Sequence, residues 1–302
     1  MSISHYIKDI GRGRDGARAL TRAHAADLMG QVLDGQVTDL ELGAFCIAMR
    51  VKGETPEEMA GFLDATQARL CALSTGADTP VVSLPSFNGA RKLPVLTPLL
   101  GHLLAREGIA VVMHGTATES TRVTSQDVLQ AMGVSTLTQV GTVRAGEVVF
   151  APTEVLCPGL KKMLDVRRVV GLRNPAHSLV KLMNPTQTSD ALLVSSYTHP
   201  EYAVSMAATF ELTAARALLL RGTEGEVVAD ARRTPQMDAF VRGTRTCLVE
   251  AQAGSLLKLP ELPIEIDAAS TARYTRAVLD GELPVPAPLT AQVQAVLKAL
   301  SL

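Results

Sequence analysis

The sequence predicts a two-domain protein, in which a small all-helical domain joins a larger α/β domain with a mostly parallel sheet flanked by helices. Residues 1–74 show helical periodicity only, later residues alternate between strand and helix, and a basic helical pair at 157–186 interrupts that alternation. We therefore expect a helical domain of residues 1–74 and 157–186, and an α/β domain of residues 75–156 and 187–302. With 302 residues, 47% of them hydrophobic, the chain can bury both cores.

The helices of the first domain are predicted from signals at their ends. A helix over residues 20–34 stops at Gly35, a residue that suits the left-handed position after a helix. Thr38 with Glu41, and Thr55 with Glu58, form capping boxes that open helices through residue 50 and to about residue 72. The segment 11–22, which precedes them, carries four arginines among glycines and is expected to be loose.

The second domain is predicted from short apolar, β-branched runs that alternate with helical segments. Such a pattern is typical of a mostly parallel sheet. The expected strands are residues 81–84, 109–113, 148–150, 191–195 and 217–220, and the expected helices are residues 95–107, 127–132, 201–212, 268–280 and 289–300.

The basic helical pair at 157–185 has six cations against one acid, Asp165, which is a formal charge of +5 (6 − 1). Pro158 suits a first helical position, Gly171 marks an interruption, Asn174 resembles an N-cap and Asn184 precedes the proline that closes the second helix. The cations are Lys161, Lys162, Arg167, Arg168, Arg173 and Lys181. Taken alone, such a run is more often a solvated helix face than a binding surface.

The composition excludes several classes of protein. A net charge of −1 means that any polyanion must bind locally, and an aromatic content of 3% without Trp offers little for stacking on bases. Four scattered cysteines and six dispersed histidines suggest reduced core thiols of a cytoplasmic protein, with no zinc site. The polar N-terminus and the lack of a long apolar run predict neither secretion nor a membrane span.

Several segments resemble anthranilate phosphoribosyltransferases. Residues 114–133, HGTATESTRVTSQDVLQAMG, are similar to the family's H-G-N-R-x-x-S-S…D-x-L-E-x-L-G, and residues 168–185 are similar to R-E-L-G-x-R-T-x-F-N-x-L-G-P-L-x-N-P. The order of elements and the R-x-V-L-x-G-E pattern at 276–282 agree, so the resemblance covers nearly the whole chain. It implies a nucleoside phosphorylase/phosphoribosyltransferase-like fold and a homodimer formed through the helical domain.

The chain departs from the family where the family binds phosphoribosyl pyrophosphate. The glycine-rich loop K-V-G-T-G-G-D is replaced by residues 83–89, SLPSFNG, in which Pro85 has no N–H to offer. The N-x-S-T motif is replaced by residues 93–96, LPVL, and Thr116 replaces the Asn after His114-Gly115. The Asp-Glu pair that would hold Mg²⁺ is missing from residues 221–227, RGTEGEV. These losses predict no metal site, no cofactor and no transferase activity.

Positive charge replaces the lost catalytic parts, as in the YbiB-type DNA-binding branch of this family. That resemblance implies a non-catalytic homodimer that binds nucleic acid through its phosphates, largely independently of sequence. DNA is the favoured candidate. The predicted contacts are the six cations of 157–185 with Arg221, Arg232 and Arg233. The alternative is a pentosyl transferase with an altered pyrophosphate loop. A regulatory partner that kept only the dimer is a third hypothesis without specific support.

Individual residues have competing interpretations. A remnant of the substrate cleft is predicted at His114, Gly115, Thr116, Ser120 and Thr121. A structural role is favoured for His114, and Ser120 and Thr121 are expected to cap the following loop. Arg168 takes the position at which the family holds the anthranilate carboxylate, although a phosphate contact is favoured. Glu224 and Glu226 are expected in an exposed turn rather than at a metal.

Overall fold

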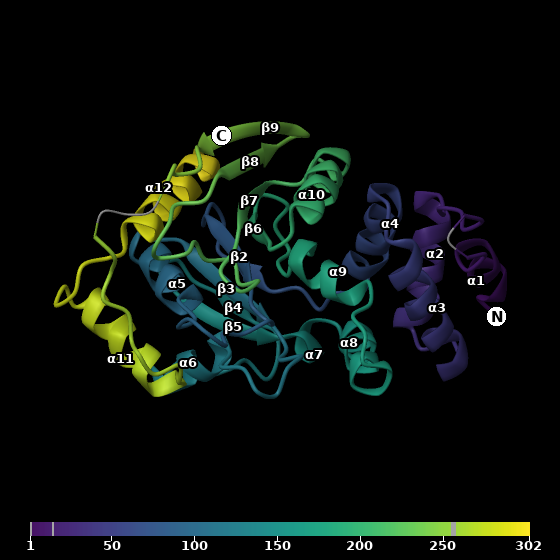
Figure 1. Ribbon diagram of the computed structural model, residues 1–302, viewed down its shortest axis with the longest axis horizontal. Helices are drawn as coiled ribbons and strands as arrows, with labels where there is room; N and C mark the ends of the chain where they lie inside the picture. Colours follow the sequence, from purple (N-terminus) through teal and green to yellow (C-terminus); the bar gives the residue numbers. More distant parts are fainter. Residues whose placement is uncertain (1, 14, 255–257) are drawn as a thin grey trace. The chain divides into compact units, whose positions relative to one another are not determined.

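The structure, a computed structural model, describes residues 2–13, 15–254 and 258–302 (Figure 1). The chain divides into two compact units. Unit 1 comprises Met1–Cys71 and Thr153–Met183, and unit 2 comprises Ala72–Pro152 and Asn184–Leu302. The domain limits expected from sequence, after residues 74, 156 and 186, compare with 71, 152 and 183 in the structure.

Unit 1 is entirely helical in the part of it that is described. Its helices are α1 (Ser4–Ile10), α2 (Arg22–Leu33), α3 (Asp39–Lys52), α4 (Pro56–Gln67), α7 (Thr153–Leu156), α8 (Pro158–Val170) and α9 (Ala176–Leu182). Its core includes Phe45 and Phe62, whose rings meet edge to face at 5.9 Å. A Cβ at Gly159 would lie 2.2 Å from the carbonyl oxygen of Leu33, so glycine allows the start of α8 to pack directly against the end of α2.

Both predicted capping boxes are confirmed. Thr38 caps α3 with Glu41, and Thr55 caps α4 with Glu58. Glu58 is fully buried, and its carboxylate also accepts the N–H of Leu20 at 2.9 Å and forms an ion pair with Lys52 at 2.6 Å. One capping residue therefore holds three segments of unit 1 together. The cost of burying its charge is offset because the carboxylate oxygens accept hydrogen bonds and pair with a cation.

Unit 2 is built on a seven-stranded sheet of order β5-β3-β2-β6-β7-β8-β9. The strands are β2 (Val81–Pro85), β3 (Ala110–Gly115), β5 (Val148–Pro152), β6 (Leu192–Tyr197), β7 (Ala217–Arg221), β8 (Met237–Val241) and β9 (Thr244–Val249). The first five in spatial order run parallel, and β8 and β9 are antiparallel. A small parallel pair, β1 (Ser74–Thr75) and β4 (Thr142–Val143), lies apart from this sheet.

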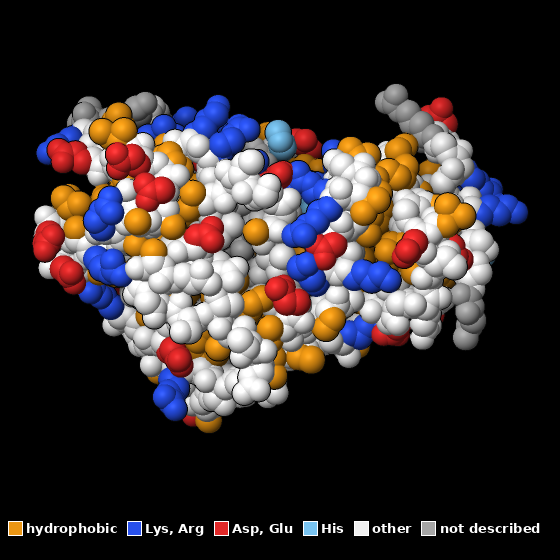
Figure 2. All heavy atoms as spheres, turned by 90° about the horizontal axis from the view of Figure 1, so that it is seen from below, with side chains coloured by type: hydrophobic (Ala, Val, Ile, Leu, Met, Phe, Trp, Pro, Cys, Tyr) orange, Lys and Arg blue, Asp and Glu red, His pale blue; other side chains and the backbone are white. Residues whose placement is uncertain are grey.

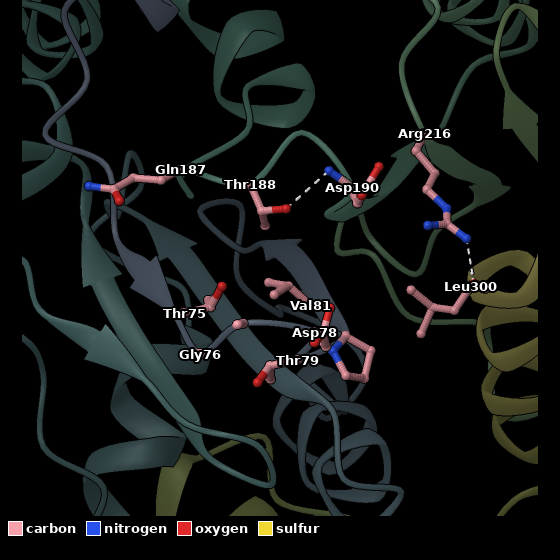
Figure 3. A pocket seen from close by; sticks show the side chains of 12 residues that line it. Thr75, Gly76, Asp78, Thr79, Val81, Gln187, Thr188, Asp190, Arg216 and Leu300 are labelled. Atoms are coloured by element: carbon pink, nitrogen blue, oxygen red, sulfur yellow. Dashed lines mark hydrogen bonds between the residues drawn. The ribbon is translucent and has the colours of Figure 1, made fainter.

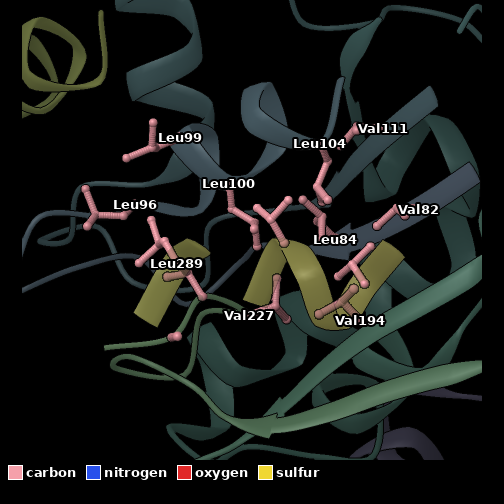
Figure 4. Close-up of a cluster of buried hydrophobic side chains, with 14 of the residues drawn as sticks. Val82, Leu84, Leu96, Leu99, Leu100, Leu104, Val111, Val194, Val227 and Leu289 are labelled. Atoms are coloured by element: carbon pink, nitrogen blue, oxygen red, sulfur yellow. The ribbon is translucent and has the colours of Figure 1, made fainter. Parts of the chain in front are cut away.

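Helices pack on this sheet around one large apolar core (Figure 4). They are α5 (Thr97–Arg106), α6 (Ser125–Ala131), α10 (Pro200–Thr213), α11 (Ala268–Leu279) and α12 (Ala287–Ser301). Val82, Leu84 and Val111 of the strands meet Leu100 of α5 and Leu289 of α12 in this core. The predicted fold class is confirmed.

The main departures from the predicted elements lie at edges and ends. The β8–β9 hairpin was not predicted: β9 is largely exposed and lacks a long apolar run, and its buried partner β8 was missed with it. Arg242 and Gly243, both with positive φ, form its two-residue turn. Helix α1 was missed as well. The helix expected from residue 95 begins at Thr97, and the one expected to reach about residue 72 ends at Gln67.

The cysteines differ in part from the expectation of core thiols. All four are free, and Cys46 and Cys157 are buried, whereas Cys71 and Cys247 are exposed. Burial raises the pKa of the Cys46 thiol to about 12. In the described part of the chain, no helix has the length and apolarity needed to cross a bilayer.

Candidate nucleic-acid interface and strand-end loop

The six cations of the basic helical pair lie on α8, on α9 and on the segment between them. Lys162 and Arg168 have side chains that are 58% and 67% exposed, and Arg173 is also exposed. Lys161, Arg167 and Lys181 are half-buried. Figure 2 shows Lys and Arg side chains on one face of the molecule, with acidic side chains among them. We call these six residues the basic face of unit 1.

Lys162 and Arg168 are directed outward because the opposite side of α8 is apolar. Leu160, Met163 and Leu164 are buried, and the helix ends at Gly171 in the left-handed conformation, φ 77°. The Asn174 amide donates to the Met163 carbonyl at 2.7 Å and accepts the N–H of Ala176 at 3.0 Å. Asn174 thus ties the start of α9 to α8, although α9 begins at Ala176 rather than at Pro175, and ends at Leu182, before Asn184.

Asp165 partly neutralises the basic face. Its carboxylate forms an ion pair with Lys161, one turn before it, and lies 3.4 Å from Nε of Arg168. Lys162 lies 4.0 Å from the Asp39 carboxylate at the start of α3. At least three of the six cations therefore have an acidic neighbour within unit 1, and such pairs at the surface contribute little to stability.

The other three predicted cations belong to unit 2. Arg221 is the exposed last residue of β7. Arg232 forms a bidentate pair with Asp230 at 2.9 and 2.7 Å, which raises the pKa of Arg232 and, against the effect of burial, lowers that of Asp230. Arg233 donates to the carbonyl oxygen of Gln252 at 3.4 Å. Arg232 is therefore charged but already engaged.

The carboxyl ends of β2 and β7 carry an arrangement that sequence analysis did not predict. Glu226 is only 2% exposed, and its Oε1 accepts the backbone N–H groups of Asn88 at 3.0 Å and Gly89 at 2.8 Å. Its Oε2 accepts the hydroxyls of Ser86 and, at 3.2 Å, Thr97. The hydroxyl of Ser125 lies 3.5 Å from the same oxygen. The expectation that Glu226 lies in an exposed turn is wrong.

Glu224 makes a second arrangement of the same kind. Its Oε2 accepts the backbone N–H groups of Arg91, Lys92 and Leu93 at 2.9, 3.0 and 3.2 Å. Partial burial opposes ionisation, but these donors outweigh it and lower the pKa of Glu224. The loop of residues 86–97, which we call the strand-end loop, therefore does present backbone donors despite Pro85, and the chain's own carboxylates, Glu224 and Glu226, accept from them.

The predicted remnant cleft is only partly assembled. His114 is fully buried at the end of β3, with Nε2 3.0 Å from Ser83 Oγ, and burial lowers its pKa to about 3. Gly115 has φ 146°, and a Cβ there would lie 2.3 Å from the Ser86 carbonyl oxygen. Thr116 is half-buried, whereas Ser120 and Thr121 are exposed. The cap of the following helix, α6, is Thr124, which bonds with Asp127. The loop-capping role expected for Ser120 and Thr121 stays a prediction.

Comparison with known proteins identifies the chain's family. The helical bundle domain of the glycosyl transferase family matches residues 4–69. The uncharacterized protein YbiB of Escherichia coli (strain K12) is 41% identical, over 99% of this chain and 94% of its own length. The chain belongs to the YbiB-type branch of the anthranilate phosphoribosyltransferase-like family.

More distant proteins resemble this chain in sequence or in fold. Anthranilate phosphoribosyltransferase of Methanopyrus kandleri is 28% identical over 93% of this chain and 84% of its own. The crystal structure of the Thermus thermophilus enzyme superposes with a TM-score of 0.71 at 23% identity, covering 97% of this chain and 87% of that one. The Saccharomyces cerevisiae enzyme, in complex with PRPP and Mg, superposes with a TM-score of 0.70 at 14% identity, covering 99% and 88%.

The strand-end loop of this YbiB-type protein does not fit a bound Mg²⁺ ion. Both carboxylates near the loop, Glu224 and Glu226, are directed at N–H and O–H donors, and a donor's hydrogen competes with a cation for the same oxygen. In the described part of the chain, no cluster of three His, Cys, Asp or Glu side chains could hold a metal ion.

A cavity of about 450 Å³ in unit 2 lies away from this loop (Figure 3). It is lined by Thr75, Asp78 and Thr188 among others, next to the amino ends of β2, β6 and β7. Arg216 donates to the carbonyl oxygen of Ala299 at 3.1 Å, near the carboxyl end of α12. Ligands of open α/β sheets bind at the carboxyl ends of the strands, so the cavity is at the opposite edge from the expected site.

The site residues that sequence analysis missed are Ser86, Asn88, Gly89, Thr97, Ser125 and Glu226. Their separation in the chain, up to 140 residues, concealed the arrangement. One signal was available. Glu226 directly precedes the apolar run Val227-Val228-Ala229, which is buried, and a residue beside a buried run is seldom in a free turn.

Proposed function

We propose that this protein binds nucleic acid through phosphate contacts and without catalysing a reaction, with DNA as the favoured nucleic acid. The observation that carries the proposal is the basic face of unit 1, where six cations face one acid on α8, α9 and the segment between them. Lys162, Arg168 and Arg173 on it are exposed. Contacts to phosphate position a protein on nucleic acid without selecting a sequence.

The composition supports weak sequence preference. An aromatic content of 3% without Trp leaves few side chains to stack on bases. Arg221, Arg232 and Arg233 of unit 2 are proposed as further phosphate contacts, and Arg232 would have to exchange Asp230 for a phosphate. The four free thiols support a location in a reducing compartment, the cytoplasm.

The strand-end loop supports the non-catalytic part of the proposal. Transfer from phosphoribosyl pyrophosphate requires oriented donors or a metal at the pyrophosphate, because an uncompensated anion is costly to bury. Here five backbone N–H groups of the loop already serve Glu224 and Glu226. A substrate anion would have to displace these carboxylates.

The test is a salt titration of binding to a short DNA duplex, followed by fluorescence anisotropy. Replacing Lys162, Arg168 and Arg173 together by Ala should reduce the negative slope of log K against log[salt] by about 2.7, at about 0.9 per phosphate contact. The matched control replaces Arg106, Arg144 and Lys298, which are exposed cations of unit 2, and should leave the slope unchanged.

Two results would refute the proposal. One is the absence of binding to duplex or single-stranded DNA or RNA at low salt. The other is an affinity that does not depend on salt, because phosphate contacts release counterions. Equal losses in the test and control variants would refute the assignment to the basic face and leave only a general attraction.

We further propose that the protein is a homodimer joined through α3. Leu40, Ile47 and Val51 are exposed at helical spacing, with Ala44 between them, and a cavity of about 290 Å³ lies beside them in unit 1. An exposed apolar stripe of this kind fits a second copy of the same surface. Replacing Ile47 and Val51 by Asp should halve the mass measured by light scattering, while Val204→Asp on α10, another exposed apolar position, should not.

A pentosyl transferase activity is the second candidate, favoured by the 28% identity with the Methanopyrus kandleri anthranilate phosphoribosyltransferase. It predicts a Mg²⁺-dependent rise in melting temperature with millimolar phosphoribosyl pyrophosphate, and turnover when anthranilate is added. We expect neither. A rise that needs no Mg²⁺ and disappears in salt would show pyrophosphate acting as a mimic of the nucleic-acid backbone.

A further inference from the structure

Glu226 is held by polar groups from three separate parts of unit 2, all within hydrogen-bond distance of one carboxylate. The donors are the backbone N–H groups of Asn88 and Gly89 and the hydroxyls of Ser86 and Thr97. The hydroxyl of Ser125 lies 3.5 Å from the carboxylate and 2.7 Å from the hydroxyl of Ser86. The groups that contact the Glu226 carboxylate are backbone and hydroxyl dipoles, which compensate its charge. Convergent N–H groups of this kind form an anion-binding nest.

The residues that follow Glu226 are fixed in the core, which positions its carboxylate in this nest. Val227, Val228 and Ala229 follow it into the apolar core. The buried amide of Gln292 donates to the Val227 carbonyl at 2.7 Å and accepts the N–H of Ala229 at 2.8 Å. This anchoring fixes the residue after Glu226, so its side chain is directed at the loop by the fold and not by a chance rotamer.

Glycine brings the two segments close enough for this contact. Gly225 has φ 91°, and a Cβ there would lie 2.4 Å from Nδ2 of Asn88. Gly222 is as restricted, since its Cβ would lie 2.0 Å from the carbonyl oxygen of Glu226. The turn of residues 222–226 is therefore built to lie on the loop of residues 86–89 and to bury one acid between them.

We infer that Glu226 is an internal anion that fills an oxyanion site, and that removing its carboxylate turns this site into a receptor for a small free oxyanion. The ligand class is set by the donors, which are N–H and O–H groups without a cation, and by the space of one carboxylate. Formate matches that space, and inorganic phosphate is a larger oxyanion of the same class. The inference does not depend on nucleic-acid binding.

The test compares the wild type with Glu226→Ala and Glu226→Gln in thermal melts with added formate or phosphate, against chloride at equal ionic strength. Glu226→Ala should melt below the wild type and regain stability as formate is added, with an affinity for formate at least about tenfold above that of the wild type by calorimetry, since a ligand stabilises the state it binds. Glu226→Gln should not respond, because its amide still fills the space.

The matched control is Glu224→Ala, which removes a neighbouring carboxylate that is more exposed. Its response to formate should be weaker than that of Glu226→Ala. If Glu226→Ala does not fold in chloride, the same comparison is made on refolding yield, where recovery in formate supports the inference and no recovery overturns it. A folded Glu226→Ala that responds to formate no more than to chloride, or a wild type that binds formate equally well, also overturns it.

Discussion

The strand-end loop of unit 2 and the basic face of unit 1 treat charge in opposite ways. In the loop, Glu226 is 2% exposed and surrounded by donors of its own chain. On the basic face, Lys162 and Arg168 are 58% and 67% exposed, each with one acidic neighbour at 4.0 and 3.4 Å. The first region satisfies its anion internally, while the second presents cations that a polyanion can reach.

This difference shows that a charged residue in a sequence is not by that fact alone accessible to a ligand. The turn of residues 221–227 and the helix of residues 158–170 both appear polar and solvated from sequence. Burial and partners separate them, because a buried charge must have its hydrogen bonds made within the fold, whereas an exposed charge is solvated by water and screened by salt. We therefore expect the basic face to bind ligand and the strand-end loop to contribute to the stability of the fold.

The largest difference expected between the two regions is in their contribution to stability. Glu226→Ala leaves buried donors without an acceptor and should lower the free energy of unfolding by about 3 kcal/mol or more. Asp165→Ala on the basic face, which removes two surface pairs, should lower it by about 1 kcal/mol or less. Urea denaturation followed by circular dichroism measures both. Equal losses in the two variants would contradict the distinction between the regions.

The second effect concerns pH and the buried His114 beside the loop. Its pKa is lowered by burial to about 3, while an unfolded histidine titrates near its ordinary value of 6.5. Below pH 6.5 the unfolded chain therefore binds a proton at this histidine, while the folded chain does not. The free energy of unfolding falls as the pH is lowered towards 3. The slope from this group reaches about 1.4 kcal/mol per pH unit.

Replacing His114 by Gln should remove that contribution and flatten the dependence of unfolding free energy on pH between 6.5 and 4. The control is His199→Gln, an exposed histidine at the start of α10. An unchanged slope in the His114 variant would show that the acid sensitivity comes from other groups. His177 of unit 1 is a candidate, since burial also lowers its pKa, to about 4.

Much of the fold could be predicted from the sequence because its signals are local. Capping boxes such as Thr38 with Glu41 and the apolar runs of the parallel strands act within a few residues. Strand β9 could not, because an exposed edge strand needs no apolar run. The candidate site residues likewise fall into those that the sequence predicted and those that it did not. Local charge density revealed the basic face, whereas Ser86 and Glu226 meet across 140 residues, and only the sheet brings them together.

The smallest expected effect comes from Asp165, the acid of the basic face. Its carboxylate pairs with Lys161 and lies 3.4 Å from Nε of Arg168, so it competes with phosphate for both cations. Asp165→Asn keeps the shape of the side chain and raises the formal charge of residues 157–185 from +5 (6 − 1) to +6. Affinity for a DNA duplex at low salt should rise by about two- to fivefold, the effect of a surface pair worth less than about 1 kcal/mol.

Anisotropy titrations beside Asp190→Asn, an exposed acid of unit 2, separate this effect from a change in net charge alone. The increase should shrink as salt is added, because both the lost pair and the gained phosphate contact are screened. A fall in affinity would mean that Asp165 orients Lys161 and Arg168 for phosphate instead of competing for them. In that case the basic face, like the loop around Glu226, would depend on an acid of its own chain to hold its geometry.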